Sequence, residues 1–191
     1  IVGTATLPAL YILVRQLFDR RTALVATAFL AAYHFHIHYS RLGSNQVADG
    51  LFLTAALAAL VWGLRRDSTA AFALSGAIAG LGTYFYAGAR LTPVALLAVL
   101  TLAVVTSPRR WRIPWIGVAL LALGFLVAAA PMLLLAVQHP ADFNARLSTV
   151  GIIQSGWLTR EVELTGKSLE TILSEQFLKA ALGFNHYWDR T

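Results

Sequence analysis

Six long apolar stretches divide the chain, and this pattern leaves few folds open. They cover residues 1–14, 22–39, 47–64, 69–89, 91–107 and 113–137. A bilayer hydrocarbon core about 30 Å thick requires about 20 apolar residues of α-helix, and all but the first stretch come near that length. We therefore predict an all-α membrane protein, a polytopic bundle of about six transmembrane helices.

The composition excludes a soluble globular domain. Hydrophobic residues make up 58% of the 191 residues and charged residues 13%, whereas soluble domains carry about 25% charged residues. The net charge of +6 does not indicate a nucleic-acid partner. The basic residues of the segment 1–137 lie at the ends of the apolar stretches, where the positive-inside rule accounts for them. Without a cysteine, the chain has neither a disulfide framework nor a thiolate metal site.

Arginines are distributed unevenly over the gaps between the apolar stretches. Only Arg41 and Arg90 lie in the second and fourth gaps. The first, third and fifth gaps hold eight arginines, namely Arg15, Arg20, Arg21, Arg65, Arg66, Arg109, Arg110 and Arg112. Because cytoplasmic loops are enriched in basic residues, we predict that these eight lie in the cytoplasm and that Arg41 and Arg90 lie outside.

With this orientation, we predict a multi-pass protein of the cell (inner) membrane. Its chain has two parts. Residues 1–137 form the transmembrane helical module, and residues 138–191 form a polar loop segment on the external, periplasmic side. Apolar residues recur on one face of the segment 168–182, which predicts an amphipathic helix there among other short helices. We also expect the chain to be an internal fragment, because residue 1 already lies inside an apolar stretch.

Small residues recur at helical spacing within the fourth apolar stretch. Gly76 and Gly80, with Ala73 and Ala77 beside them, form one small-residue face. In lipid such a face allows two helix backbones to approach closely, and we expect the partner helix to belong to the same chain.

The densest group of functional side chains surrounds three histidines at the external end of the second stretch. His34 and His38 are four residues apart and share a helix face, which is the spacing of a metal-ligand pair. A divalent metal is therefore possible, but a third ligand is not evident from the sequence. The alternative is that these histidines donate hydrogen bonds to neighbouring helices or to lipid headgroups, and we assign no metal site.

Arg41 and Arg90 are the candidates for binding a phosphate group. Arginine carries a permanent charge, and its planar fork matches two phosphate oxygens. The alternative is a salt bridge from either arginine to Asp49, or a solvated end that extends toward water. Asp49 itself is a functional candidate because carboxylates are rare inside membranes, although it can also complement the dipole at a helix start.

Aromatic residues accompany both arginines. His38 and Tyr39 precede Arg41, and Tyr86 lies four residues before Arg90. These three residues and Asp49 are the candidates for lining a site, since aromatic rings can hold a sugar or a polyprenyl chain. Anchoring at the membrane interface is the alternative role for the aromatic rings.

Four segments resemble the membrane module of bacterial glycosyltransferases of the GT-C type. The closest group is family 39, which contains protein mannosyltransferases and aminoarabinose transferases. The similar segments are LPALYILVRQLFDRR at 7–21, HIHYSRLG at 36–43, YFYAGARLTP at 84–93 and GIIQSGWL at 151–158.

The resemblance implies an enzyme that moves a sugar from a polyprenyl-phosphate donor to a protein or lipid acceptor on the external face. It also implies that the catalytic acidic residue belongs to a loop that precedes Ile1. Asp49 does not match that motif, and the catalytic residue is therefore unknown. The alternatives are one half of a transporter or flippase, which would carry polar residues near the membrane midplane, and a non-catalytic membrane module.

Overall fold

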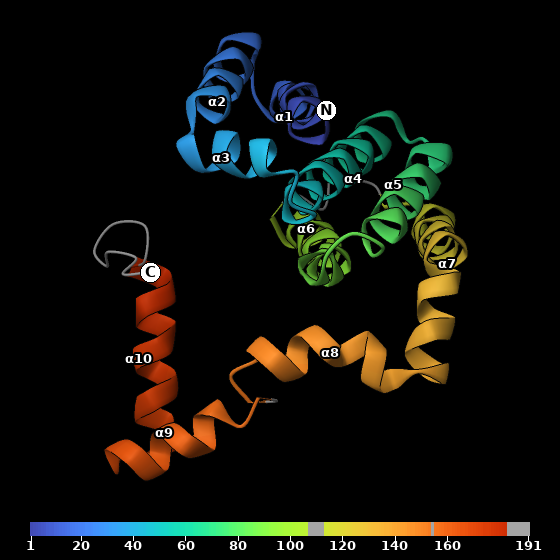
Figure 1. The fold of residues 1–191 in the computed structure, drawn as a ribbon. Coiled ribbons are helices and arrows are strands. Elements are labelled where there is room, and N and C mark those ends of the chain that lie inside the picture. The colour runs from blue at the N-terminus through green and yellow to red at the C-terminus, as the bar shows by residue number, and fades with distance from the viewer. Residues whose placement is uncertain (107–112, 154, 183–191) are drawn as a thin grey trace. The chain divides into compact units, whose positions relative to one another are not determined.

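The computed structural model describes residues 1–106, 113–153 and 155–182. All elements within these ranges are helices, which confirms the predicted all-α class (Figure 1). The chain divides into two compact units, residues 1–134 and residues 135–191. The predictions that concern Arg109, Arg110, Arg112 and Gln154 lie outside the described residues.

The first unit contains most of the helices. Its elements are α1 (Val2–Leu17), α2 (Arg20–Ala32), α3 (His34–Leu42), α4 (Gln46–Arg66), α5 (Thr69–Gly82), the 3₁₀ helix η1 (Ala87–Leu91), α6 (Thr92–Thr106) and most of α7 (Trp115–Gln138). Within the described residues, three segments are long and apolar enough to cross a membrane: α4, the continuous segment of η1 and α6, and α7. Helix α5 is also apolar but has only 14 residues.

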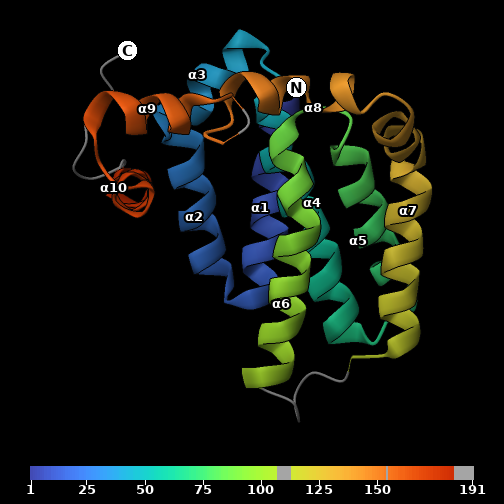
Figure 2. The same ribbon diagram turned by 90° about the horizontal axis from the view of Figure 1, so that it is seen from below.

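The ends of the first unit differ in charge, as the gaps in the sequence do. Figure 2 shows the junctions between α1 and α2 and between α4 and α5 at one end, and α3 and the start of α4 at the other. The first end carries Arg15, Arg20 and Arg65 among others, whereas Arg41 belongs to α3 at the second end. Helices α1, α2, α4 and α5 thus run between the two ends, whereas α3 stays at one end. Which end faces the cytoplasm remains a prediction.

The core of the first unit lies between α4, α5 and α6. Its fully buried side chains include Leu60, Phe72 and Leu96. One polar side chain joins two of these helices, because the buried Ser75 hydroxyl of α5 donates a hydrogen bond of 2.8 Å to the Ala56 carbonyl of α4. Helix α4 also packs along α1, so it is central to the unit.

Glycines make the contact between α5 and α7, which confirms the predicted small-residue face. A Cβ atom on Gly76 would overlap the Leu121 carbonyl of α7, and one on Gly80 would overlap the Phe125 carbonyl. On the opposite side, Gly124 of α7 lies against the Ala73 carbonyl of α5. The two backbones are therefore in direct contact, and the partner helix belongs to the same chain.

The second apolar stretch differs from the prediction of one continuous span over residues 22–39. The backbone of Tyr33 is extended, with φ −71° and ψ 115°, so α2 ends at Ala32 and α3 begins at His34. Helix α3 then runs across the end of α2 instead of continuing along its axis (Figure 2). Contacts with α1 stabilise this direction, because His36 Nε2 lies 3.0 Å from the Gly3 carbonyl oxygen and Ser40 packs against Gly3.

In its described residues, the second unit contains the end of α7 and three short helices, α8 (Pro140–Val150), α9 (Trp157–Thr165) and α10 (Leu169–Leu182). Gly166, with φ of +66°, ends α9 in the left-handed conformation that glycine adopts without strain. The Ser168 hydroxyl then accepts the Thr171 N–H at 3.3 Å at the start of α10. Lys167, which lies between α9 and α10, forms an exposed ion pair of 2.6 Å with Glu175 of α10.

Candidate functional site

Helix α3 carries three of the predicted site residues, His38, Tyr39 and Arg41. The helix ends at Gly43, whose φ of +66° is the left-handed conformation that commonly terminates a helix. The last turn therefore presents Arg41 close to the start of α4. Arg41 is exposed, and a guanidinium in such a place can reach either water or an anionic group.

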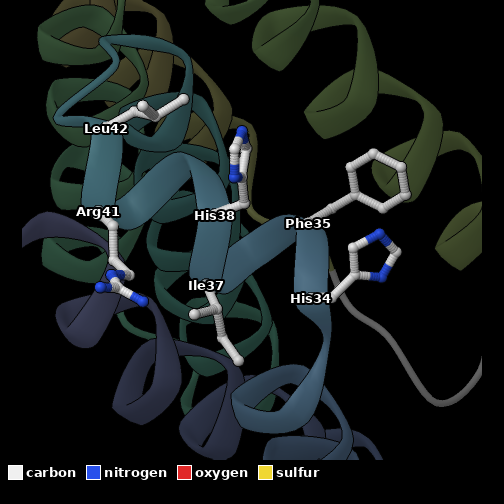
Figure 3. A pocket seen from close by; sticks show the side chains of 6 residues that line it. All are labelled: His34, Phe35, Ile37, His38, Arg41 and Leu42. Atoms are coloured by element: carbon white, nitrogen blue, oxygen red, sulfur yellow. The ribbon is translucent and has the colours of Figure 1, made fainter.

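A groove of about 650 Å³ follows one side of α3. Figure 3 shows the side chains that line it, with Arg41 one turn from Ile37 and the His34 ring beside the Phe35 ring. The ring centroids of His34 and Phe35 are 4.1 Å apart. His38 and Leu42 complete the lining. The groove thus combines a guanidinium and two imidazoles with apolar side chains.

The three histidines of α3 have different surroundings. Within the described residues, no group of three or more histidine, aspartate or glutamate side chains could hold a metal ion. His34 and His38 line the same groove, and no third histidine, aspartate or glutamate of the described residues joins them in a metal-holding group. The third histidine of the cluster, His36, instead contacts the Gly3 carbonyl of α1, so its role is to fix α3.

A second, more apolar pocket of about 240 Å³ lies between α2, α3 and α4. Aromatic rings of Tyr33, Phe35 and Tyr39 line it, and Gln46 and Val47 of α4 lie on its other side. The structure therefore places Tyr39 and His38 in different cavities, although the two residues are adjacent in sequence.

Asp49 lies in the first turn of α4 and faces η1. Its Oδ2 atom fills the space that a Cβ atom on Gly88 would need, and the backbone N–H of Ala89 points toward the carboxylate. The other oxygen, Oδ1, is buried and has no hydrogen-bond partner among the described residues. One turn earlier on α4, Gln46 Nε2 donates a hydrogen bond of 3.2 Å to the Tyr86 hydroxyl. The start of α4 and the η1 segment are thus joined by polar side chains.

The surroundings of Arg41 test the alternative that it forms a salt bridge with Asp49. In the part of the chain that the structure describes, no carboxylate lies within the 4.0 Å ion-pair distance of Arg41. The alternative of a salt bridge from Arg41 to Asp49 is therefore wrong, because α3 carries Arg41 and Asp49 faces η1. Arg90 lies in η1 itself and is half-buried.

Two residues of this region were not among those predicted from the sequence. Gln46 is a neutral residue at a helix start, and the sequence alone does not mark it as functional. The one indication is that it lies three residues before Asp49 on the same side of the helix. Gly88 matters because it has no side chain, and one glycine among 14 cannot be singled out without the fold.

These features define the class of the protein. It is a polytopic helical membrane protein, and Arg41 and Arg90 belong to the region of its bundle that also holds polar side chains and aromatic pockets. The family model described as dolichyl-phosphate-mannose-protein mannosyltransferase matches residues 1–134. The chain belongs to this family and is therefore a membrane glycosyltransferase of the mannosyltransferase type. No curated protein and no solved structure matches the chain.

Proposed function

We propose that the chain is the membrane part of a glycosyltransferase that takes its sugar from a polyprenyl-phosphate donor at the external membrane face. Membership of the mannosyltransferase family supports the reaction class. The observation that carries the proposal is that Arg41 and Arg90, 49 positions apart in sequence, belong to two elements, α3 and η1, that both contact α4. Both elements lie next to the start of α4, because α3 directly precedes it and η1 contacts it through Gln46 and Asp49.

The chemistry of such a donor matches the residue types of this region. When the bond between sugar and phosphate breaks, negative charge develops on the leaving phosphate, and guanidinium groups stabilise that charge. The apolar pocket beside Tyr39 suits the first isoprene units of a lipid chain. His38 and Tyr86 lie near the two arginines in sequence and are proposed to line the same site. None of these residues is proposed as the general base.

A transfer assay with two classes of donor tests this proposal. The protein in lipid vesicles is given mannose carried either by a polyprenyl phosphate or by a nucleotide, together with an acceptor peptide rich in serine and threonine. We expect transfer from the lipid-linked donor and none from the nucleotide-linked donor, because no part of the proposed site is specific for a nucleotide. Equal transfer from both donors, or transfer from the nucleotide alone, would contradict the proposal.

The proposed orientation has its own test, which the absence of cysteine makes simple. Single cysteines introduced as Ser44→Cys and Ser155→Cys are expected to react with a membrane-impermeant maleimide added outside intact cells. Cysteines at Arg66 and at Arg110 are expected to react only after the cells are opened. The reverse labelling pattern would place Arg41 and the segment 138–191 in the cytoplasm and would exclude an external site.

A further inference from the structure

The start of α4 holds the η1 segment through three contacts that involve different atoms. Gln46 donates its hydrogen bond to Tyr86, which directly precedes η1. The Asp49 carboxylate lies against Gly88 and faces the N–H of Ala89. Ala89 is buried, with 1% of its surface exposed, so this side of η1 is packed into the unit. Arg90 follows directly in the same 3₁₀ turn.

The contact between Asp49 and η1 depends on glycine at position 88. A Cβ atom there would overlap Oδ2 of Asp49. The φ angle of Gly88 lies outside the left-handed region, so an alanine is conformationally allowed at this position. Substitution of Gly88 therefore changes the space between η1 and Asp49 without imposing an unusual backbone conformation.

Stability alone does not explain the carboxylate at position 49. A buried polar atom without a partner costs on the order of 1–3 kcal/mol, and Oδ1 of Asp49 is such an atom. A carboxylate in the first turn of α4 gains about 0.3–1 kcal/mol from the helix dipole, which is less than this cost. The contact with η1 therefore explains the carboxylate better than the stability of α4 does.

From these contacts we infer that Asp49 is a positioning residue: it holds η1 so that Arg90 is fixed in the site. The inference rests on the proposed function, in which Arg90 binds the donor phosphate. Asp49 itself does not bind the donor. It sets the place of Arg90 through Gly88 and Ala89, and Gln46 supports the same segment through Tyr86. A guanidinium that is preset in this way loses less conformational freedom when phosphate binds.

Two substitutions break the contact from opposite sides. Asp49→Ala removes the carboxylate, and Gly88→Ala pushes η1 away from it. We expect each to weaken the binding of polyprenyl-phosphate mannose about tenfold, because a displacement of a binding group by about 1 Å has effects of this order or larger. Asp49→Asn is expected to restore binding to within about threefold, since the amide oxygen can still face the Ala89 N–H.

The decisive measurement repeats the two substitutions in a protein that already carries Arg90→Ala. If Asp49 acts through Arg90, the second substitution has nothing left to displace, and binding changes less than about twofold. Binding is measured with the full chain in lipid nanodiscs, and thermal unfolding of every variant is recorded alongside. Thr54→Ala in the same helix is the matched control for Asp49→Ala, because the exposed Thr54 hydroxyl donates its hydrogen bond to the Gly50 carbonyl of its own helix.

The outcomes separate this inference from the function on which it rests. Losses that multiply in the double variants would show that Asp49 acts independently of Arg90, which overturns the inference and leaves the proposed function intact. An Asp49→Asn variant as weak as Asp49→Ala would overturn it too, because charge rather than contact would then be required. If Arg90→Ala alone leaves donor binding unchanged, both the role of Arg90 and the positioning role of Asp49 are excluded.

Discussion

Replacement of Arg41 or Arg90 by alanine is expected to weaken the binding of polyprenyl-phosphate mannose on the order of 10- to 100-fold per arginine. A hydrogen bond to a charged group contributes about 1.5–3 kcal/mol, and a bidentate arginine–phosphate contact lies in the upper part of that range. Because the same contact strengthens as charge develops on the leaving phosphate, the rate of transfer at saturating donor should fall as well.

Lysine variants separate charge from geometry. Arg41→Lys and Arg90→Lys keep the positive charge but lose the planar fork, so we expect an intermediate loss of binding. Arg66→Ala, at the opposite end of α4, is the control that should leave donor binding unchanged. A polyprenol that lacks the phosphate is the control ligand. If the alanine variants bind the donor as tightly as the unmodified protein, neither arginine contacts the phosphate.

The all-α class could be predicted because it depends on patterns that extend over many residues. Each apolar stretch contributes many residues to the signal, so α4 and α7 were evident as spanning segments. The break at Tyr33 was not evident, because the apolar and aromatic residues continue through it without proline or glycine. It depends on contacts of α3 with Gly3, a residue more than 30 positions away in sequence.

The candidate site shows the same limit at the level of single residues. Arg41 and Arg90 were evident because they are rare where they occur, and rarity can be read from the sequence. The surroundings of Asp49 were not, because they depend on the absence of a side chain at Gly88 and on the path of η1. The fourth apolar stretch, residues 69–89, was predicted to form one helix. In the structure α5 ends at Gly82, and η1 follows as a separate element.

A single methyl group added at Gly76 is expected to destabilise the bundle more than most substitutions in its lipid-facing helices. In Gly76→Ala the new Cβ atom would overlap the backbone carbonyl of Leu121, and backbone atoms of a helix cannot rotate away as side chains do. The two helices must therefore separate. Overpacking of this kind costs about 1–3 kcal/mol in soluble cores, and in lipid no hydrophobic driving force between helices restores the contact.

Gly50→Ala provides the matched control for this prediction, with an effect of opposite sign. The nearest atom to a Cβ on Gly50 is Thr6 Cγ2 at 3.9 Å, which is an ordinary van der Waals distance. Alanine should therefore only gain helix propensity there, about 1 kcal/mol in favour of folding. The measurement is thermal unfolding of both variants in the same detergent or nanodisc. A Gly76→Ala protein that unfolds at or above the temperature of the unmodified protein would show that α5 and α7 do not pack through their backbones. The stability of the bundle would then depend on the core between α4, α5 and α6 alone. In that case Gly124→Ala, whose new Cβ atom would face the Ala73 carbonyl, would not lower the unfolding temperature either.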